Sequence, residues 1–212
     1  MAVESVKYPA DLNIDYVEKR DRMTALFRIV LSLPILLLLT LLPSTSGSFM
    51  NDSSNSVSGT GSVIALGLTL ATALMILVRQ SYPKWWYDFA LELNRFSTRV
   101  GAYMFLLTDR YPSTVDAQDV HLDIAYPDVK KDLNRYMPFV KWLLAIPHFI
   151  VLAFLVFGAM IGTVIAWLSI LFTGKYPKDI FDFVVGVGRY GTRLTAYAFL
   201  LTTDMYPPLS LE

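Results

Sequence analysis

The residues whose side chains could do chemistry are few and far apart in this chain. Its 212 residues include two histidines, His121 and His148, and no cysteine. The sequence has no His-x-x-x-His pair, no glycine-rich phosphate loop and no nucleophile elbow. The lack of cysteine excludes disulfides, thiolate metal sites and cysteine nucleophiles. We therefore expect a protein that is not an enzyme and has no cofactor or metal site, with haem or metal ligation by His148 as an alternative.

Charged residues form a stripe along each of two segments expected to be long amphipathic helices. These helices are predicted to start at Pro83 and Pro177, because proline suits the first helical turn, where no amide donor is needed. The acids come first and the bases last, in agreement with the helix dipole. Two interpretations are open: the charges pair within the protein, or the arginines hold lipid headgroup phosphates. The stripe residues are Asp88, Glu92, Arg95 and Arg99 in the first helix and Asp182, Arg189 and Arg193 in the second.

Small residues form a second line on the same two helices. Small side chains at helical spacing let helix backbones approach closely in lipid. We expect the two long helices to pack on each other along this line, near a pseudo-twofold axis. The helix-packing seam consists of Ala90, Asn94, Ser97 and Gly101 in the first helix and Gly188, Gly191 and Thr195 in the second.

The composition indicates contact with lipid. Hydrophobic residues make up 54% of the chain and charged residues 17%, against roughly 25% charged in soluble domains. Apolar stretches cover Thr24–Leu42, Gly61–Val78 and Met137–Thr173. A spanning helix needs about 20 apolar residues, so the last stretch is too long for one ordinary span. We interpret it as a helical hairpin turning near Gly158 to Gly162, which gives four transmembrane helices; a single bent helix is the alternative.

The basic residues predict an orientation for these spans. Lysines and arginines flank them on one side, whereas the loop 43–60 has neither. By the positive-inside rule both termini lie in the cytoplasm. Arg28 and Lys141, about one turn inside their spans, are expected to reach back to the headgroups. The formal net charge of zero gives no global field to attract nucleic acid.

The two halves of the chain repeat each other in order. We expect a first repeat at 1–112 and a second at 113–212, each with a short strand, a helical hairpin and a long amphipathic helix. The alternation of apolar residues in the two short strands suggests that they pair with each other across the repeat. The main matches are Leu12 to Tyr16 with Leu122 to Tyr126, Arg28 with Lys141, Pro34 with Pro147, Tyr82-Pro83-Lys84 with Tyr176-Pro177-Lys178, Arg95 with Arg189, Arg99 with Arg193, Leu106-Leu107-Thr108 with Leu200-Leu201-Thr202, and Tyr111 with Tyr206.

Three stretches carry a resemblance to a known family. They are 106–112 (LLTDRYP), 141–148 (KWLLAIPH) and 206–211 (YPPLSL). They resemble the bacterial membrane family catalogued as domain of unknown function 4389, in two tandem copies over nearly the whole chain. The first half departs from the pattern, because Ser32-Leu33-Pro34-Ile35 has no histidine where the second half has His148. The resemblance implies a fold and a location in the bacterial inner (plasma) membrane, but no activity.

These observations together predict an all-α membrane protein with four spans in two parallel repeats, two long amphipathic interfacial helices and a short two-stranded sheet. The function expected is that of a non-enzymatic accessory or scaffold protein that binds membrane lipids and a larger membrane protein complex or a homo-oligomer, and no nucleic acid. The alternative is a small transporter or channel with a path between the repeats. The two differ in whether Asp88, Asp182 and the arginines line a water-filled cavity or a packed seam.

Overall fold

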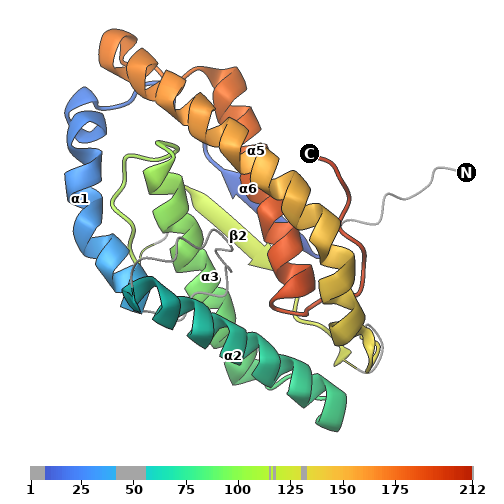
Figure 1. The fold of residues 1–212 in the computed structure, drawn as a ribbon. Helices are drawn as coiled ribbons and strands as arrows, with labels where there is room; N and C mark the ends of the chain where they lie inside the picture. Colours follow the sequence, from blue (N-terminus) through green and yellow to red (C-terminus); the bar gives the residue numbers. More distant parts are fainter. Residues whose placement is uncertain (1–7, 42–55, 115, 117, 130–132, 212) are drawn as a thin grey trace, which may run out of the picture.

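The computed structural model describes residues 8–41, 56–114, 116, 118–129 and 133–211, and it is mostly helical with one small sheet (Figure 1). The loop expected at 43–60 lies largely outside the described residues. In chain order the elements are β1 (Ala10–Ile14), α1 (Arg22–Leu41), α2 (Ser56–Arg79), α3 (Lys84–Met104), β2 (Val120–Ile124), α5 (Met137–Thr173) and α6 (Lys178–Ala198).

The two short strands pair as the sequence predicts. β1 and β2 are antiparallel, with Leu12 opposite Leu122 at the centre of the register. Alternate residues, among them Leu12, Leu122 and Ile124, are buried, whereas Asn13 and Asp123 face outward. This alternation turns one face of the sheet toward the helices, as expected for strands with a two-residue side-chain period.

Each strand lies on the long helix of the other half of the chain. β1 packs mainly against α6, and β2 packs against α3. The core beneath the sheet joins Leu12 and Leu122 to Val184 and Val185 of α6 and Ala159 of α5. Since a two-stranded sheet is marginal by itself, the strands depend on the helices for their stability.

α5 is one continuous helix of 37 residues, about 55 Å long at the usual rise per residue. The predicted hairpin turn near Gly158 to Gly162 is wrong, and the single-helix alternative holds. The glycines serve helix packing: a Cβ added at Gly158 would meet Phe183 Cζ at 3.4 Å, and one added at Gly162 would meet Ile180 Cγ2 at 3.1 Å. Both partners belong to α6, so the glycines let α6 approach α5 closely.

The prediction of four spans is also wrong. Among the described residues one helix, over Val140–Thr173, is long and apolar enough to cross a membrane. Two of the expected spans were the two arms of the predicted hairpin, and the single helix α5 takes their place. In α2 the apolar stretch Thr69–Arg79 is shorter than a membrane span. One such helix is compatible with a membrane protein.

The strand exchange predicts that a truncation in β1 destabilises the whole molecule. We expect Leu12→Ala to lower the free energy of unfolding by about 2–5 kcal/mol, because it removes a buried side chain that α6 contacts. Thermal unfolding in detergent measures this as a lower Tm. Leu209→Ala is the control, since Leu209 is 70% exposed. Equal shifts in Tm for the two variants would contradict the prediction.

Candidate functional site

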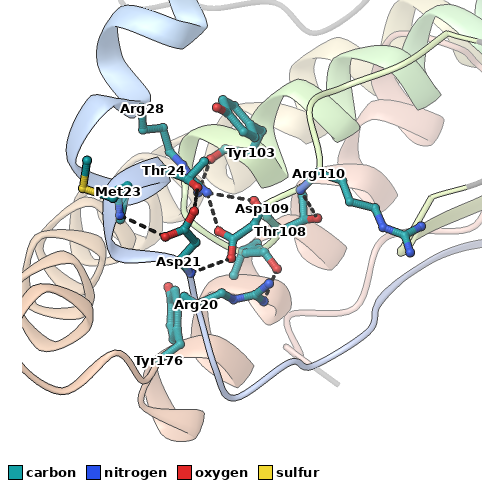
Figure 2. Close-up of polar contacts among 12 residues, drawn as sticks. Arg20, Asp21, Met23, Thr24, Arg28, Tyr103, Thr108, Asp109, Arg110 and Tyr176 are labelled. Carbon is teal, nitrogen blue, oxygen red and sulfur yellow. Dashed lines mark hydrogen bonds and ion pairs between the residues drawn. The ribbon is translucent and has the colours of Figure 1, made fainter.

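A buried arginine organises the polar cluster shown in Figure 2. Arg28 of α1 is almost fully buried, and its Nη2 lies 2.7 Å from Oδ1 of Asp109, which follows α3. Arg28 also donates to the carbonyl oxygens of Tyr103 at 2.7 Å and Thr108 at 3.1 Å. Its guanidinium carbon is 4.5 Å from the centre of the Tyr103 ring. The charge is therefore paired, hydrogen-bonded and stacked on an aromatic ring, which offsets the cost of burying it.

The same cluster ties the start of α1 to the turn after α3. The backbone amide of Asp21 donates to Oδ2 of Asp109 at 3.1 Å. The hydroxyl of Thr24 donates to Asp21 at 2.6 Å, and this bond, with the amide of Met23, holds the pKa of the Asp21 carboxyl below its usual range. Arg20 donates to the carbonyl of Leu107, and burial lowers its pKa while the Asp109 charge raises it. Asp109 thus pairs with Arg28, accepts from the residue that precedes α1, and stabilises the nearby Arg20 through its charge.

A matching cluster stands in the second half of the chain. Lys141 of α5 is 1% exposed, and its Nζ lies 2.6 Å from Oδ1 of Asp204. The same Nζ lies 5.4 Å from the centre of the Tyr197 ring. Oδ2 of Asp204 accepts from the backbone amide of Asn134 at 2.6 Å. Arg28 and Lys141 are therefore buried against aspartates, and the expectation that they reach back to headgroups is wrong.

An unusual backbone turn places each aspartate. Leu106 has φ of 62° and Leu201 has φ of 56°, both in the left-handed region. A non-glycine residue held there is strained, and the burial of both leucine side chains keeps the turn in place. The structure thus equates Leu106 with Leu201, one residue later than the sequence match to Leu200. The same shift aligns Asp109 with Asp204.

The first pair of stripe arginines holds the sheet. Arg95 of α3 donates from Nε to the Leu122 carbonyl at 3.0 Å and pairs with Glu92 at 2.6 Å. Arg189 of α6 donates from Nε to the Leu12 carbonyl at 3.1 Å. Each arginine therefore binds the middle carbonyl of the strand that comes from the other half.

The second pair of stripe arginines holds the segments that follow each long helix. Arg99 donates to the Ser113 carbonyl at 2.7 Å, and Arg193 donates to the Ser210 carbonyl at 3.0 Å. The stripe acids Asp88 and Asp182 are exposed. All the stripe arginines thus bind the chain's own carbonyl groups, and the choice between a structural and a lipid-binding stripe stays a prediction.

The small residues of the seam line a cavity of about 300 Å³ between α3, α5, α6 and the sheet. The seam residues that line it are Asn94, Ser97, Gly101, Gly188, Gly191 and Thr195. A Cβ added at Gly188 would meet Leu12 Cδ2 at 3.0 Å, and one added at Gly191 would meet Leu152 Cδ1 at 3.9 Å. These two glycines thus bring α6 close to β1 and α5, while direct packing of the long helices along the seam stays a prediction.

The two histidines lie in different environments. His148 is 1% exposed, its Nδ1 is hydrogen-bonded to the Tyr190 hydroxyl, and its ring centre lies 4.6 Å from that of Tyr206. His121 is exposed, and its Nε2 lies 3.4 Å from Oδ2 of Asp15. In the part of the chain that the structure describes, no group of three His, Cys, Asp or Glu side chains could hold a metal ion.

The aspartates of the two clusters are residues that the sequence prediction missed. Asp109 and Asp204 each lie two residues before a matched tyrosine, Tyr111 or Tyr206, and this recurrence was the available signal. Their partners lie 81 and 63 positions away in the chain, as the numbering of Arg28 with Asp109 and Lys141 with Asp204 shows. Contacts at such separations follow from the fold and not from local spacing.

Breaking the first cluster should destabilise the fold strongly. We expect Asp109→Asn to cost about 3–5 kcal/mol, because it leaves the Arg28 charge buried without its partner. Arg28→Lys should cost less, since the second cluster works with Lys141 in the matching position. Chemical unfolding in detergent measures both, with the exposed Asp88→Asn as control. If Asp109→Asn and Asp88→Asn have the same free energy of unfolding, the cluster has no structural role.

Comparison with known proteins identifies part of the chain. The family model described as Domain of unknown function (DUF4389) matches residues 137–210. No curated protein and no solved structure matches the chain. The match covers α5, α6 and the turn with Asp204, whereas a second copy of the family domain in the first half stays a prediction. The segment 137–210 thus matches the family that its motifs resemble, Domain of unknown function (DUF4389).

Proposed function

We propose that this chain is a non-enzymatic accessory or scaffold protein of the bacterial inner membrane, which binds lipid and a membrane protein partner. The observation that carries the proposal is the surface of α5. In the most apolar 18-residue stretch of this helix, only 11% is buried inside the protein. Large apolar side chains such as Phe154, Phe157 and Phe172 are each more than 60% exposed. An apolar surface of this size in contact with water would be costly, and lipid or a partner protein would cover it.

A second apolar surface on α1 supports lipid contact. Val30, Leu33 and Leu37 recur at spacings of three and four and are about 60% exposed. The opposite side of this helix buries Arg28 and Ile35. The helix thus has one side packed in the protein and one side of apolar residues available to lipid.

The contacts of the basic groups support a binding role over catalysis. Arg28 and Lys141 are neutralised by aspartates, and the stripe arginines bind backbone carbonyls. A general acid or base has to reach a substrate from a cleft. In the described residues, these groups instead hold parts of the chain together.

A small transporter for an apolar species is the alternative function. The cavity between the two long helices favours it, because it lies where a path between the halves would run. Asp88, Asp182 and the stripe arginines are not among its described lining residues, and no other charged residue is either. This neutral lining argues against an ion path.

Charges on the exposed face of α5 should remove the protein from the membrane. We expect the double variant Phe154→Lys, Phe157→Lys to lose membrane insertion, because each lysine near a helix centre costs about 2.5–3.5 kcal/mol in lipid. An immunoblot of carbonate-washed membranes measures the fraction of the chain that stays in the membrane. Leu209→Lys, at an exposed position outside α5, is the control and should leave the membrane fraction unchanged. A wild-type chain that carbonate extracts fully would refute membrane integration.

Purification from native membranes tests the accessory role. We expect the chain, tagged at its C-terminus and extracted in mild detergent, to copurify with a stoichiometric protein partner. Native mass spectrometry gives the mass and the stoichiometry of the complex. A monomer or homo-oligomer that carries lipid alone would overturn the accessory role and favour transport assays in liposomes.

A further inference from the structure

The cavity between the long helices has the size and shape of a binding site. Its volume of about 300 Å³ is at the lower end of the range of small-molecule pockets. α3 and α6 form two walls, α5 forms a third through Leu152 and Val156, and the sheet closes it with Leu12 and Leu122. The cavity is partly open to the outside. A ligand could therefore enter without unfolding the core.

The lining is mostly apolar, and several of its polar side chains are bonded to their own helices. The hydroxyl of Ser97 donates to the Leu93 carbonyl at 2.9 Å, and that of Thr195 donates to the Gly191 carbonyl at 2.9 Å. Thr98 and Thr192 make the same bond to their own helices. These donors are used within the helices, so the cavity offers a ligand mostly carbon atoms. A mostly apolar lining of this kind suits an apolar molecule.

The position of the cavity indicates which apolar molecule enters it. Leu152, Val156 and Ala159 line it from α5, while Phe154 and Phe157 of the same helix are exposed on the surface that would meet lipid. One helix thus separates the cavity from the lipid-facing surface. We infer that the cavity binds one hydrocarbon chain, supplied by a membrane lipid or a free fatty acid. This inference rests on the proposed lipid contact and assigns it an internal site.

Gly101 offers a variant that fills the cavity without disturbing its walls. It lines the cavity from α3, and a Cβ added there would have no atom within 4 Å. Gly101→Leu therefore occupies the space of the ligand and should not lower Tm. Gly67→Leu is the matched control, because Gly67 is also a helical glycine with nothing within 4 Å of an added Cβ, but lies on the exposed side of α2.

Photocrosslinking of the full chain in phosphatidylglycerol and phosphatidylethanolamine vesicles tests the inference. The probes are palmitate and phosphatidylglycerol, each with a diazirine on the hydrocarbon chain, and labelled peptides are mapped by mass spectrometry. We expect labels in 97–104 of α3 and 188–195 of α6, and a roughly tenfold loss of these labels in Gly101→Leu but not in Gly67→Leu. The probe that labels better identifies the source of the chain.

Other outcomes distinguish failure of the cavity site from failure of the proposed function. Labels on the exposed face of α5 without labels in α3 and α6 would overturn the cavity site and leave lipid contact standing. Labels in α3 and α6 that persist in Gly101→Leu, with unchanged Tm, would also overturn it. No labels on any helix would overturn both the site and the proposed lipid contact.

Discussion

The hydrogen bond from each long helix to the middle of the opposite strand is the interaction on which the rest of the structure depends. Arg189 binds the carbonyl of Leu12, and Arg95 binds the carbonyl of Leu122. Leu12 and Leu122 lie opposite each other in the sheet. A two-stranded sheet has little stability alone. These bonds fix it against α3 and α6 and make the two halves of the chain interdependent, because each half stabilises a strand of the other.

The buried charges follow from this arrangement. Packing α1 and α5 against the ends of the long helices takes Arg28 and Lys141 out of contact with solvent. A buried charge is tolerated when it is paired and hydrogen-bonded. The left-handed turns at Leu106 and Leu201 bring Asp109 and Asp204 back to supply that pairing. Backbone strain at two residues is thus retained because it satisfies two buried charges.

The apolar surfaces divide into an outer and an inner set, and the proposed lipid contacts involve both. The outer set covers α5 and one side of α1, where large side chains are exposed. The inner set lines the cavity between the long helices, where small residues leave space unfilled. Small residues on a helix have two physical effects: they allow close approach, as at Gly162, or they leave room, as at Gly101. The neighbouring helix decides between them.

The sequence by itself determined the short strands and the long amphipathic helices of this protein. The strands, the long helices after Pro83 and Pro177, and the matched positions of the stripe arginines all follow from short-range periodicity, which local sequence encodes. The tertiary structure decided whether 137–173 turns back or continues, because Ile180 and Phe183 of α6 occupy the space beside its glycines. It also decided that Arg28 meets Asp109 and that the seam encloses a cavity. Such contacts join residues far apart in the chain, and local periodicity carries no information about which distant side chains fill the same space.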